Sequence, residues 1–120
     1  MKSITAIILF FISIISFGQE KQKETKTSSF NVSGNCEQCK KRIENAADIK
    51  GVKSAEWDEK THILKVIYRT DKVSETQIKQ AILSAGHDVE NEKTSDAAYN
   101  KLPDCCKYKA SDKSKQVHTK

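Results

Sequence analysis

The chain has 120 residues, of which 31% are charged and 37% hydrophobic, and its formal net charge is +5. This length suits one small domain rather than two. The basic balance does not indicate a nucleic-acid-binding protein, because lysines are interleaved with acidic residues, aromatic residues are few and the N-terminus resembles an export signal. Since no catalytic triad, carboxylate pair or phosphate-binding loop is visible, we do not expect an enzyme.

Residues 1–18 are expected to be a signal peptide. Lys2 supplies the positive start, and residues 4–17 form an almost unbroken apolar run that ends at Gly18, where we place the cleavage. The alternative is an uncleaved membrane anchor, but the run is short for a spanning helix and no basic residue follows it directly. We therefore expect a periplasmic or secreted protein with no membrane anchor after cleavage. The polar residues 19–27 are expected to form a flexible leader.

A strand and a helix are expected next, on either side of a short turn. Phe30 and Val32 alternate with polar residues, which indicates a strand over residues 28–33. Asn35 is expected to cap a helix over residues 37–49. The apolar residues of this helix recur at intervals of three and four, so one of its faces is expected to be buried.

Three further strands and a second helix complete the expected domain. The strands are predicted over residues 52–58, 62–68 and 88–92, and the helix between the capping residue Ser74 and Gly86. The order strand–helix–strand–strand–helix–strand is typical of a ferredoxin-like α+β fold. It predicts two helices on one face of a four-stranded antiparallel sheet.

Cys36 and Cys39 lie where the first predicted strand gives way to the first predicted helix. The unpaired N–H groups and the dipole at a helix start favour a thiolate, so the thiol pKa values are expected to fall there. Lys40 and Lys41 add positive charge nearby. Two anionic sulfurs on an exposed loop suit a soft metal ion such as Cu(I), Zn(II) or Hg(II).

A redox pair and a structural disulfide are the alternatives to metal binding at Cys36 and Cys39. A thiol–disulfide redox protein normally places its pair after a parallel strand and beside a tryptophan, whereas Trp57 is distant in sequence. A structural disulfide between Cys36 and Cys39 would close only a very small loop and stabilise little. Metal binding is the favoured interpretation, and redox activity is its main alternative.

The segment from Phe30 to Cys39 resembles the metal loop of heavy-metal-associated domains. That family includes small copper chaperones, the periplasmic mercury-binding protein and domains of copper-transporting P-type ATPases, and the resemblance covers residues 28–93. It implies a two- or three-coordinate thiolate site at Cys36 and Cys39 in a monomeric metallochaperone. The cargo would be Cu(I) in the first place, with Hg(II) or Zn(II) as alternatives. The partner would be a metal-transporting membrane protein or another metal-binding domain.

The resemblance also draws attention to two positions near the loop. The family usually carries a methionine before its first cysteine, packed beneath the loop, but here residues 33–35 are Ser-Gly-Asn. We therefore do not infer the family's loop rigidity or its metal preference for this chain. His87 follows a glycine on a second loop that lies beside the metal loop in this family, which makes it an auxiliary ligand candidate. The alternative for His87 is a solvent-exposed turn residue.

The polar tail over residues 94–120 contains a second pair of cysteines. Cys105 and Cys106 are auxiliary ligand candidates that would form a lid over the first site, a second metal site, or disulfides. About thirteen residues separate Glu92 from Cys105 and reach roughly 43–47 Å when extended, so a return to the metal loop is feasible. Such a return requires Tyr99 and Leu102 to dock on the domain, and this docking is expected to be weak without metal.

Overall fold

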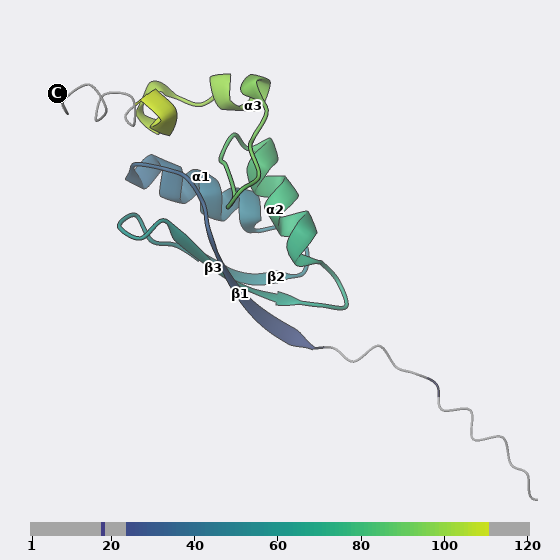
Figure 1. Cartoon of the computed structure of the whole chain (residues 1–120). Coiled ribbons are helices and arrows are strands. Elements are labelled where there is room, and N and C mark those ends of the chain that lie inside the picture. The colour runs from purple at the N-terminus through teal and green to yellow at the C-terminus, as the bar shows by residue number, and fades with distance from the viewer. Residues whose placement is uncertain (1–17, 19–23, 111–120) are drawn as a thin grey trace, which may run out of the picture.

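Two helices cover one face of a three-stranded antiparallel sheet (Figure 1). The strands are β1 (Thr25–Asn31), β2 (Val52–Trp57) and β3 (Ile63–Arg69), and their order across the sheet is β1-β3-β2. The helices are α1 (Glu37–Ala47) and α2 (Glu75–Ser84). The expected α+β architecture with an antiparallel sheet is confirmed, and it is consistent with the ferredoxin-like fold.

The computed structural model describes Gly18 and residues 24–110. Apart from Gly18, the predicted signal peptide lies outside these residues, as does most of the predicted leader. The C-terminal part of the described chain contains a short helix, α3 (Asp96–Asn100), and a 3-10 turn, η1 (Asp104–Cys106). Among the described residues, no helix has the length and apolar character needed to cross a membrane.

The core forms where apolar residues on the sheet meet the inner faces of both helices. Leu64 and Val66 on β3 are fully buried, as their spacing of two residues predicts for one face of a strand. Ile43 on α1 and Ile78 on α2 are fully buried as well. These two helices therefore pack their apolar faces on the same side of the sheet.

The fourth strand predicted over residues 88–92 is absent from the sheet, and this prediction was wrong. Val89 forms only single bridges, one to Val32 beside the end of β1 and one to Glu92. Glu90 adopts a left-handed backbone with φ of 52°, and its N–H donates to the carbonyl of Asn31 at 2.9 Å. With Val89 as the one apolar residue of the segment, there is no apolar alternation to extend the pairing, and the chain reverses instead.

The first strand begins earlier than predicted, so the predicted leader over residues 19–27 is corrected at its end. Residues 25–27 belong to β1, where Thr25 is paired with Arg69. Their side chains are exposed and polar, which is why the sequence pattern does not reveal them. The backbone of β3 continues to Arg69 and supplies hydrogen-bonding groups for the chain opposite it.

The boundaries of α2 agree with the sequence prediction. Ser74 is the N-cap, its side chain accepts from the N–H of Gln77, and the Gln77 side chain accepts from the N–H of Ser74. After the helix, Gly86 adopts a φ of 102°. A Cβ atom there would lie 2.8 Å from the carbonyl oxygen of Ala98 and 3.0 Å from Leu102 Cγ, so the C-terminal segment packs directly on this turn.

Candidate metal centre

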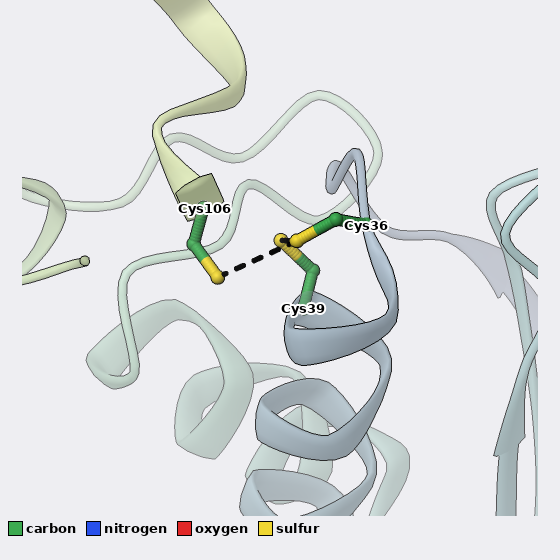
Figure 2. Close-up of side chains that lie close together, drawn as sticks. All are labelled: Cys36, Cys39 and Cys106. Carbon is green, nitrogen blue, oxygen red and sulfur yellow. Dashed lines mark hydrogen bonds between the residues drawn. The ribbon is translucent and has the colours of Figure 1, made fainter. Parts of the chain in front are cut away.

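Three cysteine sulfurs meet at the start of α1 (Figure 2). The Sγ atoms of Cys36, Cys39 and Cys106 all lie within 4.8 Å of one another. Cys36 Sγ is 3.5 Å from Cys39 Sγ and 3.9 Å from Cys106 Sγ. Cys105 is exposed and lies at the edge of this cluster, because its Sγ donates to Gln38 Oε1 at 2.9 Å and lies 3.9 Å from Cys106 Sγ.

The first turn of α1 positions the two sulfurs of the Cys-x-x-Cys pair. Cys36 is the N-cap, in an extended backbone conformation, and no side chain caps the helix through a hydrogen bond. The predicted capping role of Asn35 was therefore wrong, because Asn35 lies one residue before the N-cap. Its Oδ1 accepts instead from Cys39 Sγ at 3.2 Å, so this amide contacts the thiol that lies deeper in the loop.

The three thiols have different electrostatic surroundings. Burial on its own would raise the pKa of Cys36, but hydrogen bonds from the backbone and thiol of Cys39, from the Cys106 thiol and from the Gln38 backbone outweigh it and lower that pKa. Burial raises the pKa of both Cys39 and Cys106. Cys36 is therefore the sulfur that ionises first. The expectation of two anionic sulfurs on an exposed loop was wrong for Cys39, which is fully buried.

Trp57, at the end of β2, packs against the loop that carries the cysteines. Its indole N–H donates to the carbonyl of Val32 at 3.0 Å. A Cβ atom added to Gly34 would lie 3.0 Å from the ring, a tight contact that would require the ring or the loop to shift. The side chain is fully buried. The loop is thus supported by an indole, in a sequence that lacks the methionine usual in the resembling family.

His87 lies beside the loop but outside the sulfur cluster. Its Nδ1 is 2.7 Å from the carbonyl oxygen of Ser33, which requires Nδ1 to carry the proton, and its ring stacks on Tyr108 with 5.6 Å between centroids. The side chain is fully buried, and burial lowers its pKa. The structure therefore brings Cys36, Cys39 and Cys106 together and leaves His87 outside this group, in contact with Ser33 and Tyr108.

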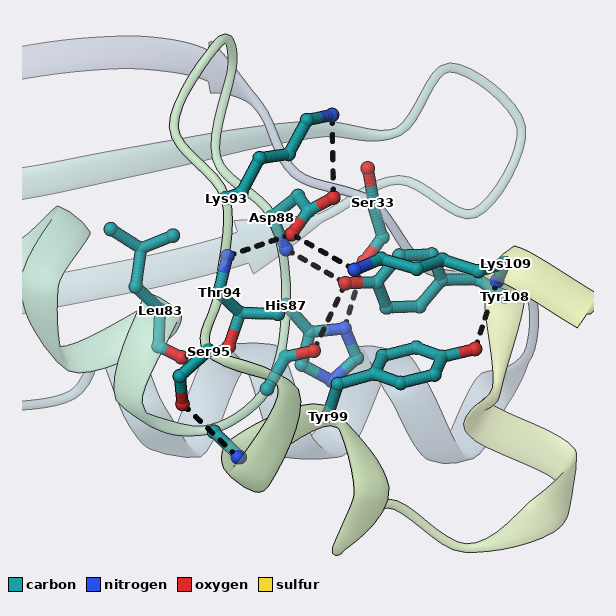
Figure 3. A network of polar contacts seen from close by, with 12 residues as sticks. Ser33, Leu83, His87, Asp88, Lys93, Thr94, Ser95, Tyr99, Tyr108 and Lys109 are labelled. Atoms are coloured by element: carbon teal, nitrogen blue, oxygen red, sulfur yellow. Dashed lines mark hydrogen bonds and ion pairs between the residues drawn. The ribbon is translucent and has the colours of Figure 1, made fainter.

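Residues 94–110, which we call the strap, lie over the metal-loop end of the domain (Figure 1). Leu102 is 4% exposed and Tyr108 is 5% exposed, so both are buried on the domain. The Tyr108 hydroxyl accepts from the N–H of Asp88 at 3.0 Å and donates to the carbonyl of Gly86 at 3.0 Å (Figure 3). The strap is therefore held by apolar burial together with directional hydrogen bonds.

The beginning of the strap is fixed by a second group of polar contacts (Figure 3). The N–H of Thr94 donates to Asp88 Oδ1 at 2.8 Å, and its hydroxyl donates to the carbonyl of Leu83 at 2.6 Å. Tyr99 packs edge-on against Tyr108 with 5.2 Å between centroids. Sequence reasoning named Tyr99 and Leu102 as docking groups but missed Tyr108 and Thr94. The available signal was an aromatic residue two positions after Cys106 in a polar segment.

Comparisons with known proteins agree with this geometry. The family model of the heavy-metal-associated domain matches residues 29–88 of the sequence. This match covers half of the chain and includes both cysteines of the loop. The copper chaperone CopZ of Staphylococcus haemolyticus is 41% identical over 61 residues, covering 49% of this chain and 90% of the relative. The solved CopZ metallochaperone is 36% identical with a TM-score of 0.52, covering 53% of this chain and 98% of that one.

A third similar structure is part of a transporter. It is the N-terminal domain of a potential copper-translocating P-type ATPase from Bacillus subtilis in its Cu(I)-loaded state. Its identity to this chain is 25% and its TM-score 0.53, and the match covers 61% of this chain and 94% of that domain.

These matches establish two points about the chain. The two CopZ relatives are metallochaperones and not enzymes, which confirms the expectation that this protein is not an enzyme. The strap begins after the last residue of the domain match, so Cys106 is an addition to the matched region. With its antiparallel sheet, its paired cysteines at the start of α1 and a domain match over residues 29–88, the chain belongs to the heavy-metal-associated domain family.

Proposed function

We propose that this protein is an exported metallochaperone for a soft metal ion. Cys36 and Cys39 hold the ion as thiolates, and the protein passes it on by ligand exchange. Cu(I) is the first choice of cargo, because thiolates select soft ions, and Hg(II) and Zn(II) are the alternatives. The receiving protein is a metal-transporting membrane protein or another metal-binding domain.

The observation that carries this proposal is the placement of two thiols of unequal acidity at one helix start. Cys36 is partly exposed and has a lowered pKa, so it offers a thiolate to an incoming ion. Cys39 lies 3.5 Å away and is buried, so it closes the site from below. A bound ion with a strong positive field deprotonates a coordinating thiol outright, which permits Cys39 to ligate despite its raised pKa.

The proposed metal-receiving partner and the proposed export are supported by separate observations. Similarity to a copper chaperone and to a domain of a potential copper-translocating ATPase supports transfer between domains of the same fold. The apolar run over residues 4–17 supports export to the periplasm or beyond the cell. Export is testable by determining the N-terminal residue of the protein recovered from each cell fraction, with Gln19 expected after cleavage.

The test of the proposal is a Cu(I) titration of the fully reduced protein without oxygen, in the presence of a chromogenic Cu(I) chelator. One equivalent is expected to leave the chelator and bind the protein, and Trp57 fluorescence reports the loop at the same time. A parallel assay follows turnover of a disulfide substrate. Catalytic disulfide exchange without stoichiometric Cu(I) uptake would overturn the proposal in favour of a redox protein.

Cu(I) affinity is expected to increase with pH. The pKa of Cys39 is raised above its ordinary value of 9.0, so this thiol is protonated near neutrality and releases its proton when the metal enters. Each proton released makes the apparent affinity rise about tenfold per pH unit. Chelator competition at several pH values below 9 measures this slope. An affinity that does not change with pH would contradict ligation by Cys39.

A further inference from the structure

The structure assigns Cys106 as the third ligand of a three-thiolate Cu(I) site, an assignment that rests on the proposed function of Cys36 and Cys39. The domain match ends at residue 88, and Cys106 reaches the loop from a segment beyond it. Cys106 on the strap would thus add a third sulfur to the two on the loop and make the site trigonal.

The sulfur triangle fits three-coordination better than linear two-coordination. With metal–sulfur bonds of about 2.3 Å, a linear site separates its two sulfurs by about 4.6 Å and a trigonal site by about 4.0 Å. Cys36 and Cys39 are 3.5 Å apart, and Cys36 and Cys106 are 3.9 Å apart. The third pair, Cys39 and Cys106, is within 4.8 Å. A trigonal ion therefore enters with sulfur shifts of less than about an ångström, whereas a linear ion would require the Cys36–Cys39 pair to spread by about an ångström and would leave Cys106 unused.

Contacts made by residues before and after Cys106 in the sequence hold it in position. Leu102 precedes it and packs against the turn at Gly86, and Tyr108 follows it and bonds the backbone of that turn. Between them, η1 presents Cys106, which is fully buried, against α1. A tethered ligand held in this way acts at a high effective concentration, because its approach to the metal is intramolecular.

The neighbouring cysteine lacks these features. Cys105 Sγ is exposed and donates to Gln38, although its carbonyl oxygen accepts from Cys36 Sγ at 3.3 Å. The two cysteines of η1 differ in burial: Cys106 is buried, 3.9 Å from Cys36 Sγ, whereas Cys105 is exposed and contacts Gln38 as well as Cys106 Sγ at 3.9 Å. This provides a matched pair for mutation, since Cys105 and Cys106 share the same segment and chemistry.

The same arrangement defines the step that hands the metal over. A thiolate of the receiving protein forms a bond to Cu(I), the bond between Cu(I) and Cys106 breaks, and the released Cys106 takes up a proton. Copper remains Cu(I) throughout, so no oxidant or reductant is needed. Cys106 leaves first because it is the one ligand on the strap, whereas the other two belong to the loop of the domain.

The experiment compares Cys106→Ser with Cys105→Ser in the full-length reduced protein loaded with one equivalent of Cu(I). X-ray absorption at the copper edge counts sulfur ligands, and chelator competition gives affinity. Wild type and Cys105→Ser are expected to show three sulfurs. Cys106→Ser is expected to show two sulfurs, to keep one copper and to bind it roughly tenfold or more weakly.

A third variant, Leu102→Ala, loosens the strap while retaining every sulfur, and it is expected to weaken binding in the same direction. Three sulfurs and unchanged affinity in Cys106→Ser would overturn the assignment, as would two sulfurs in wild type. A loss of a sulfur ligand or of Cu(I) affinity seen only in Cys105→Ser would also overturn the assignment. Absence of copper binding in wild type would instead refute the proposed function, so the two failures are distinguishable.

Discussion

Replacing Cys36 or Cys39 with serine is expected to lower Cu(I) affinity by at least about a hundredfold, so that neither variant retains stoichiometric metal against a chelator. Structural zinc sites with four ligands gain about 10–16 kcal/mol, which is roughly 2.5–4 kcal/mol for each ligand, or roughly 70- to 900-fold in affinity. A serine hydroxyl is a hard ligand that stays protonated near neutrality and does not replace a thiolate toward Cu(I). Chelator competition on the reduced variants measures the loss.

Both variants are expected to stay folded, since serine is nearly the same size as cysteine, Cys36 is only partly buried, and a hydroxyl at the buried position 39 can donate to Asn35 Oδ1 as the thiol does. Circular dichroism verifies this, and Cys105→Ser is the matched control because its sulfur is exposed and is not one of the three that all lie within 4.8 Å of one another. Unchanged affinity in Cys36→Ser or Cys39→Ser would show that the loop is not the metal site. An equal loss in all three variants would point to a general effect of removing thiols.

The Trp57→Ala substitution is expected to reduce the free energy of unfolding by about 3–5 kcal/mol, the usual cost of deleting a buried aromatic ring. The ring is fully buried, contacts the loop at Gly34 and stacks on His62 with 5.5 Å between centroids. Its indole N–H also donates to the carbonyl of Val32. Because small domains are stable by only about 5–15 kcal/mol, this loss would leave the variant close to unfolding.

Urea unfolding followed by circular dichroism measures the effect, since the fluorescent residue is removed. Trp57→Phe is the control, because it keeps an aromatic ring but leaves the carbonyl of Val32 without its indole donor. It is expected to cost about 1–3 kcal/mol, less than the alanine variant. A Trp57→Ala protein within about 1 kcal/mol of wild type would show that the indole does not support the loop.

Local patterns in the sequence determined the helices and the cysteine loop. The Ser74–Gln77 capping box sets the start of α2, and the period of buried residues sets the inner face of α1. The pair Cys36 and Cys39 is recognisable because both residues lie within one turn at a helix start. Each of these features depends on neighbours only a few residues apart, whose geometry follows from the helical repeat.

The tertiary structure alone decided the third sulfur and the missing strand. Cys36 and Cys106 are 70 positions apart, and their sulfurs meet because the chain reverses after Val89 instead of continuing along the sheet. A left-handed Glu90 and the burial of Tyr108 on the turn after α2 bring the strap back to the loop. No repeating pattern encodes such contacts, because they depend on which distant surfaces pack together and on the balance between burial and chain ordering.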